Sequence, residues 1–115
     1  MAIPKTMDEV IEQTPKFFLP EKAKGFSAVY QYIVTGEGGK NYYMEVNNGK
    51  LKVAEGKHKK PSITISCTFE DFLKSFESPE QAQLLFYQGK FKMRPLDLPL
   101  VMKFEAMFST DWQDE

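Results

Sequence analysis

The chain has 115 residues, a formal net charge of −1 and hydrophobic side chains at 42% of its positions. This length predicts one domain over residues 1–115, and the near-neutral charge argues against nucleic acid as the partner. No apolar run approaches the roughly 18 residues of a membrane span, and the first residues lack a signal-peptide pattern. One cysteine, Cys67, excludes an internal disulfide and favours a reducing compartment, so we expect a cytoplasmic protein.

Capping boxes mark three helix starts, because a hydroxyl side chain is followed three residues later by an acidic or amide side chain. These boxes predict helices over residues 7–13, over residues 69–76, and from residue 79 to near Gly89. A fourth helix is predicted over Leu98–Phe108, with Asp97 as its cap. The three boxes are Thr6 with Glu9, Thr68 with Asp71, and Ser78 with Gln81.

Between the first two helices, apolar residues recur at every second position, which is typical of strands. The predicted strands cover residues 26–35, 41–46, 50–55 and 63–68, with a short fifth strand over 90–93. Strands that precede most of the helices favour an α+β fold, a five-stranded sheet covered on one face by helices.

A glycine-rich stretch, Gly36-Glu-Gly-Gly-Lys40, follows the first strand and at first suggests a phosphate-binding loop. A strand pattern follows it rather than a helix, and Lys40 precedes Asn41 rather than Ser or Thr, so neither nucleotide-binding motif is present. We therefore predict a hairpin loop, and a second one at Asn47-Asn48-Gly49.

Six segments carry a further signal: Val34–Glu37, Tyr42–Lys50, Ser62–Ser66, Asp71-Phe72, Phe86–Met93 and Met102–Phe104. In this order they resemble the sterol carrier protein-2 family of lipid-binding domains. Phe86–Met93 resembles that family's F-x-x-G-K-L-K-I segment, and Met102–Phe104 resembles the M-K-L segment that follows it. The sequence departs from the family pattern at Lys60-Pro61 and at Arg94-Pro95-Leu96.

The resemblance implies an apolar cavity between the sheet and its helices. It also implies binding of a lipid (sterol, fatty acid, acyl-CoA or phospholipid) without catalysis and without a cofactor. We expect the following residues to contact the ligand: Tyr30, Tyr32, Tyr42, Met44, Ile65, Phe72, Leu84, Leu85, Phe91, Met93, Val101, Phe104, Met107 and Phe108.

The last predicted helix is apolar around most of its circumference, whereas a helix that covers a core needs only a stripe. Ligand contact, contact with a partner chain, and ordinary core packing all explain this composition. The sequence therefore leaves open an interaction module, either a homodimer or an accessory subunit that presents a lipid or isoprenoid to a partner enzyme. The lysine-rich run over residues 50–60 indicates either a solvated sheet edge or transient membrane contact.

The sequence gives little support for an enzyme or a metal site. His58 is the only histidine and has no second ligand at metal-binding spacing. Cys67 falls on the apolar side of a strand, where a thiol is unreactive. We therefore expect no catalytic residues and no metal.

Overall fold

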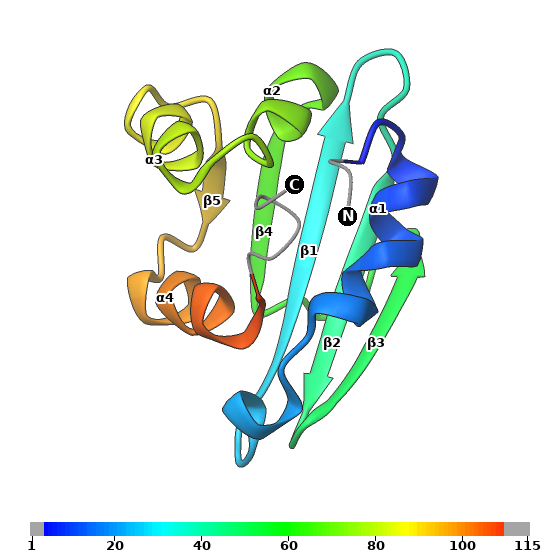
Figure 1. Cartoon of the computed structure of the whole chain (residues 1–115), viewed down its shortest axis with the longest axis vertical. Coiled ribbons are helices and arrows are strands. Elements are labelled where there is room, and N and C mark those ends of the chain that lie inside the picture. Colours follow the sequence, from blue (N-terminus) through cyan, green and yellow to red (C-terminus); the bar gives the residue numbers. More distant parts are fainter. Residues whose placement is uncertain (1–3, 110–115) are drawn as a thin grey trace.

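The structure is a computed structural model that describes residues 4–109. One sheet and its helices account for nearly all of this range (Figure 1). In chain order the elements are α1 (Met7–Gln13), the 3₁₀ helices η1 (Thr14–Phe17) and η2 (Pro20–Ala23), β1 (Ser27–Thr35), β2 (Asn41–Asn47), β3 (Lys50–Glu55), β4 (Ile63–Thr68), α2 (Phe69–Lys74), α3 (Pro79–Tyr87), β5 (Lys92–Arg94) and α4 (Leu98–Met107).

The sheet has five strands in the order β3-β2-β1-β4-β5. β1 and β4 are parallel, and the other neighbouring pairs are antiparallel. The α+β class and the five-stranded sheet predicted from the sequence are therefore confirmed. β3 lies at one edge of the sheet, and β4 lies on the far side of β2 and β1. The connection from β3 to β4 must therefore cross over these two strands before β4 can pair in parallel with β1.

All the helices lie on one face of the sheet, which we call the inner face (Figure 1). Its central side chains come from every second residue of β1, including Tyr30, Tyr32 and Val34, all of which are buried. Met7 and Val10 of α1 and Met107 of α4 pack in the same hydrophobic cluster as these side chains. The core of the domain therefore lies between the helices and this one face.

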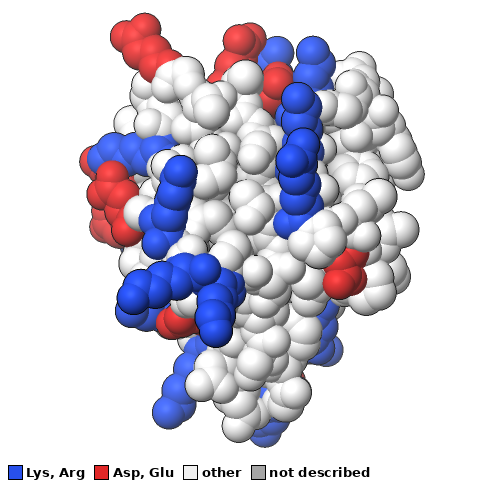
Figure 2. All heavy atoms as spheres, turned by 180° about the vertical axis from the view of Figure 1, so that it is seen from behind, with Lys and Arg blue, Asp and Glu red and all other residues white. Residues whose placement is uncertain are grey.

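The opposite, outer face carries no helix, and residues 56–62 cross it on their way from β3 to β4. His58 donates its backbone N–H to Gln31 Oε1 at 2.7 Å, and Val29 donates its N–H to Ser62 Oγ at 2.9 Å. Viewed from this side, lysine and arginine side chains stand at several places on a mostly uncharged surface (Figure 2). Alternation along the strands thus separates a buried apolar inner face from an outer face on which polar and apolar side chains are mixed.

The local sequence signals account for most element boundaries. Thr6, Thr68 and Ser78 each accept a hydrogen bond from the backbone N–H three residues on, as capping boxes predict. The two predicted hairpin turns are present. Gly36 and Gly38 have φ values of 89° and 87°, which a side chain disfavours.

The fifth strand begins later than predicted, at Lys92 rather than Lys90. Lys90 still belongs to the end of α3, because its N–H donates to Leu85 O at 3.0 Å while Gly89 N–H donates to Phe86 O. Gly89 has a φ of 75°, so these two bonds form a Schellman cap. The cap uses residues that the alternating pattern had assigned to the strand.

Candidate functional site

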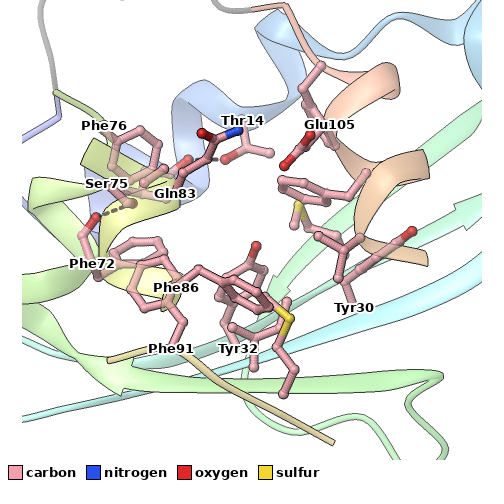
Figure 3. Close-up of a pocket in the computed structure, with 18 of the residues that line it drawn as sticks. Thr14, Tyr30, Tyr32, Phe72, Ser75, Phe76, Gln83, Phe86, Phe91 and Glu105 are labelled. Carbon is pink, nitrogen blue, oxygen red and sulfur yellow. Dashed lines mark hydrogen bonds between the residues drawn. The ribbon is translucent and has the colours of Figure 1, made fainter. Parts of the chain in front are cut away.

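An apolar pocket of about 480 Å³ lies between the inner face and the helices (Figure 3). Side chains from α1, η1, the sheet, α2, α3 and α4 line it, and most of them are aromatic or aliphatic. The pocket exists because the helices meet the sheet at its two sides, and no side chain of residues 4–109 fills the space between them.

Aromatic rings of β1 and β2 form the floor. Tyr32 and Tyr42 face each other across the two strands, with ring centroids 4.9 Å apart and nearly parallel planes. Tyr30 lies two residues before Tyr32 on the same face of β1, and its hydroxyl donates to Leu100 O at 2.7 Å. This bond ties the first turn of α4 to the sheet and fixes one end of the pocket.

The α2 side of the pocket is also aromatic. The Phe72 ring lies edge-on to Tyr32 and Tyr42 at centroid distances of 5.7 and 6.1 Å, and Phe76 packs at right angles against Phe72 at 5.2 Å. Edge-to-face contact is a favoured arrangement of aromatic rings, so these contacts stabilise the α2 side of the pocket. Ser75, which directly precedes Phe76, donates its hydroxyl to Phe72 O at 2.6 Å.

The α4 side is held by ring contacts as well. The Phe104 ring lies 5.3 Å from Tyr30 and 4.9 Å from Phe108. Phe108 in turn packs against Phe18 at 5.6 Å, beside a short backbone bridge between these two residues. The segment that follows α1 therefore closes the pocket beneath α4.

Apolar side chains that both line the pocket and reach solvent mark its mouth. Tyr87 of α3 is 79% exposed, and Leu98 and Met102 of α4 are 52% and 68% exposed. The mouth therefore lies between α3 and α4. Exposed apolar side chains gathered at one opening are typical of a site where an apolar molecule or surface makes contact.

Polar groups are few in the pocket. They are Gln13, Thr14, Ser75, Gln83 and Glu105, together with the hydroxyls of Tyr30, Tyr32, Tyr42 and Tyr87. Thr14 donates its hydroxyl to Val10 O at 2.6 Å. Among the described residues, Gln13 Oε1 is buried and has no hydrogen-bond partner.

Burial in apolar surroundings governs the titration of the inner-face groups. Desolvation raises the pKa of the Tyr30 hydroxyl to about 12 and raises the pKa values of Tyr32 and Tyr42 well above the usual range. Burial, with a smaller contribution from the Asp71 charge, raises the pKa of the Cys67 thiol to about 12. These groups are therefore protonated and uncharged at neutral pH.

The structure brings most of the predicted contact residues to the pocket. Those that line it are Tyr30, Tyr32, Tyr42, Met44, Ile65, Phe72, Phe91, Met93, Val101, Phe104 and Phe108. The other three lie elsewhere. Leu84 is 48% exposed, while Leu85 and Met107 are buried in the packing around the pocket rather than in its lining. Ligand contact by each residue stays a prediction.

The sequence reasoning missed the lining residues that come from α1 and the segment before it, from η1, from the segment after α2, and from parts of α3 and α4. These residues are Pro4, Val10, Gln13, Thr14, Phe17, Ser75, Phe76, Ala82, Gln83, Phe86, Tyr87, Leu98, Met102 and Glu105. Phe17 and Phe18 stand between Pro15 and Pro20, where no periodic pattern applies. Two adjacent phenylalanines in such a segment were the available signal.

Outside the pocket, the side chain of His58 has structural partners. His58 Nε2 lies 2.7 Å from Glu45 Oε1, and the His58 ring packs edge-on against Tyr43 on the outer face. Within residues 4–109, no three His, Cys, Asp or Glu side chains stand close enough to hold a metal ion. No helix in the same range is long and apolar enough to cross a bilayer.

The chain belongs to the SCP-2 sterol transfer family, whose family model matches residues 8–109. A similar curated protein is hydroxysteroid dehydrogenase-like protein 2 from Xenopus tropicalis, which is 30% identical over 88 residues. That alignment covers 76% of this chain but 21% of the relative. The chain thus spans about a fifth of the length of the curated relatives it matches.

Solved structures share the fold. Sterol carrier protein 2 like 2 from Aedes aegypti has a TM-score of 0.66 at 20% identity, over 84% of this chain and 88% of that chain. The sec-alkylsulfatase Pisa1 from Pseudomonas sp. has a TM-score of 0.70 at 17% identity, over 91% of this chain and 17% of that chain. The same fold therefore occurs both as nearly a whole chain and as a small part of a larger enzyme.

Proposed function

We propose that this chain binds one lipid-like molecule in the pocket and does no chemistry on it. The observation that carries the proposal is the pocket of about 480 Å³ with its apolar lining. The pocket opens between α3 and α4, so water would meet its apolar lining when no ligand is bound. Covering that lining with an apolar molecule is favourable by about 25 cal/mol for each Å² of apolar surface buried.

Family membership supports the same function. The matching family is described as a sterol transfer family, and the match covers nearly all of the described chain. Alkyl groups gain about 0.8 kcal/mol for each buried CH₂, but they gain nearly as much in a bilayer. A pocket of this kind therefore suits reversible carriage of a lipid better than its permanent retention.

The absence of activated groups among the lining residues supports a binding role rather than catalysis. Glu105 is the only charged side chain among the described residues that line the pocket. Glu105 is an exposed residue of α4, and no residue between 4 and 109 donates a hydrogen bond to its carboxylate that would poise it as an acid or base. The nearby Cys67 thiol is held protonated by burial, which raises its pKa to about 12.

A second candidate function is presentation of a lipid to an enzyme. The matches to the dehydrogenase-like protein and to the alkylsulfatase each cover about a fifth of those chains, so the domain adjoins other domains there. In this chain, the exposed Tyr87, Leu98 and Met102 at the pocket mouth would meet the partner. Lipid binding is common to both candidates. A complex that forms only with a partner enzyme would favour the second.

The test is a charge placed in the pocket. We expect the wild-type protein to bind one equivalent of Nile red, an uncharged dye that fluoresces in apolar sites. Phe104→Asp should weaken this binding by about 100-fold or more, because an unpaired carboxylate would be buried among the rings of Tyr30 and Phe108.

The matched control is Ala106→Asp, which places the same charge on the exposed side of the same helix. Circular dichroism verifies that both variants fold. Equal dye binding by folded Phe104→Asp and folded Ala106→Asp would contradict the proposed site.

A further inference from the structure

The charge of the pocket lining restricts the ligand. Glu105 carries the only charge on the described lining residues, and no lysine, arginine or histidine is among them. An ionised headgroup placed inside would lose its hydration without gaining a counter-ion, which is strongly unfavourable. The charge of Glu105 has the same sign as that of a carboxylate or phosphate.

The floor of the pocket offers a hydrogen-bonding group that the protein does not use. Tyr32 is 8% exposed, and its hydroxyl is directed into the open centre of the pocket (Figure 3). This hydroxyl makes no hydrogen bond with any residue between 4 and 109, whereas the Tyr30 hydroxyl is bound to Leu100 O at 2.7 Å. A hydroxyl that faces an apolar pocket and bonds no described protein group is available to an oxygen of an occupant, so the Tyr32 hydroxyl can serve as a ligand contact.

Two other lining groups share this property. The hydroxyl of Tyr42, stacked on Tyr32, has no hydrogen-bond partner among the described residues. Gln13 Oε1, from the end of α1, is buried and also unpaired there. A hydroxyl can donate or accept, while an amide oxygen accepts. The unused groups therefore suit a neutral oxygen function rather than a hydrocarbon alone.

We infer that the pocket selects an uncharged lipid that carries a hydroxyl or carbonyl group, binds that oxygen beside the Tyr32 hydroxyl, and discriminates against lipids with an ionised headgroup. This inference rests on the proposed lipid-binding function and names the ligand class for the same pocket. The Tyr32 hydroxyl supplies attraction for the neutral oxygen. The lack of a cation, together with the Glu105 carboxylate at the mouth, supplies rejection of anions.

The test compares three ligands with the same alkyl chain: dodecanol, methyl dodecanoate and dodecanoate. Each displaces Nile red from the wild-type protein at neutral pH, where dodecanoate is ionised. The two neutral ligands should bind at least about 10-fold more tightly than dodecanoate, because only the anion leaves an uncompensated charge. The ester and the anion differ mainly in charge, so this pair isolates the electrostatic effect.

Two variants assign the effect to residues. Tyr32→Phe removes only the hydroxyl and should weaken dodecanol binding about 5-fold, the usual value of one neutral hydrogen bond. Its matched control is Tyr43→Phe, which makes the same change on the outer face of the sheet. Glu105→Gln should improve dodecanoate binding about 3-fold, as expected for one screened surface charge. Glu80→Gln, away from the pocket lining on α3, should not change it.

Each outcome decides a different point. Dodecanoate that binds as tightly as its methyl ester would overturn the inference and leave lipid binding intact. Failure of all three ligands to displace the dye would overturn both. Dodecanol binding that is equally strong in Tyr32→Phe and Tyr43→Phe would overturn the role of Tyr32. The wild-type comparison needs no variant, so it decides the ligand class even if a substitution prevents folding.

Discussion

The two faces of the sheet are formed by alternate residues of the same strands. They differ in whether their polar side chains are hydrogen-bonded within the chain. On the outer face, Gln31 is 3% exposed and its amide is saturated, with Nε2 donating to Gly56 O at 3.0 Å and Oε1 accepting from His58 N–H at 2.7 Å. On the inner face, the next residue along β1, Tyr32, projects a hydroxyl into space that no described residue fills.

Under the proposed function, this difference separates a face whose polar groups are paired within the chain from a face that receives a ligand. The crossover of residues 56–62 satisfies the outer face from within the chain, since its backbone and the His58 ring meet Gln31 and Glu45. The inner face keeps a pocket, because the helices meet the sheet only at its two sides. Substitutions on the outer face should therefore change stability, and substitutions in the pocket should change binding.

The largest stability effect is expected at the outer face. Gln31→Leu keeps the volume but leaves the Gly56 carbonyl and the His58 N–H without partners. The free energy of unfolding should fall by about 2–4 kcal/mol, while Nile red binding by the folded protein is retained. Urea denaturation measures the first quantity, and amide exchange at His58 should accelerate.

Thr64→Val is the matched control, since Thr64 stands on the same face and its side chain makes no hydrogen bond with the described residues. Its effect should stay within about 0.5 kcal/mol. Equal destabilisation by Gln31→Leu and Thr64→Val would show that the crossover is not held by the Gln31 amide.

A smaller effect is expected where α4 is tied to the sheet. Tyr30→Phe removes the hydrogen bond to Leu100 O and should cost about 1 kcal/mol of stability, measured by urea denaturation at neutral pH. The hydroxyl's pKa is raised from 10.0 to about 12 by burial. Because the unfolded chain loses this proton first, the wild type should lose stability as pH rises from about 10 through 12.

Tyr32 and Tyr42 have raised pKa values as well, so Tyr30→Phe should reduce this alkaline loss without abolishing it. Tyr43→Phe on the outer face serves as the control. A loss of stability at alkaline pH that is the same in wild type and Tyr30→Phe would exclude Tyr30 as a contributor.

The smallest stability effect is expected from filling the pocket. Ala82 of α3 lines it, and Ala82→Leu places a larger apolar side chain in partly empty space. Thermal denaturation should show unchanged stability or a gain of up to about 1 kcal/mol, while Nile red affinity falls about 10-fold. A loss of stability above about 1 kcal/mol would indicate that the pocket is already closely packed at this point.

The sequence predicted local structure well, because short-range chemistry decides it. Thr6, Thr68 and Ser78 cap helices through hydrogen bonds that span three residues, and the alternation along β1 identifies its buried side chains. The parallel pairing of β1 with β4 could not be predicted, because no local pattern encodes which strand lies beside β1. The outer-face crossover follows from that pairing.

The pocket was predicted in part for the same reason. The aromatic floor follows from strand alternation, so Tyr30, Tyr32 and Tyr42 were identified. Leu84 and Leu85 are adjacent, and helix position alone did not indicate that Leu84 would be exposed and Leu85 buried. The contributions of Gln13 and Phe17 depend on how the segment after α1 returns across the sheet, which is a property of the tertiary structure.

The central claim is that the inner face holds one lipid molecule. Native mass spectrometry of the protein incubated with a membrane lipid extract tests it most directly. We predict a single adduct on the wild-type protein and no such adduct on Phe104→Asp. Solvent extraction of the wild-type complex should then release one uncharged, oxygen-containing lipid. A wild-type protein that remains free of lipid, or that carries the same adduct as Phe104→Asp, would contradict the account.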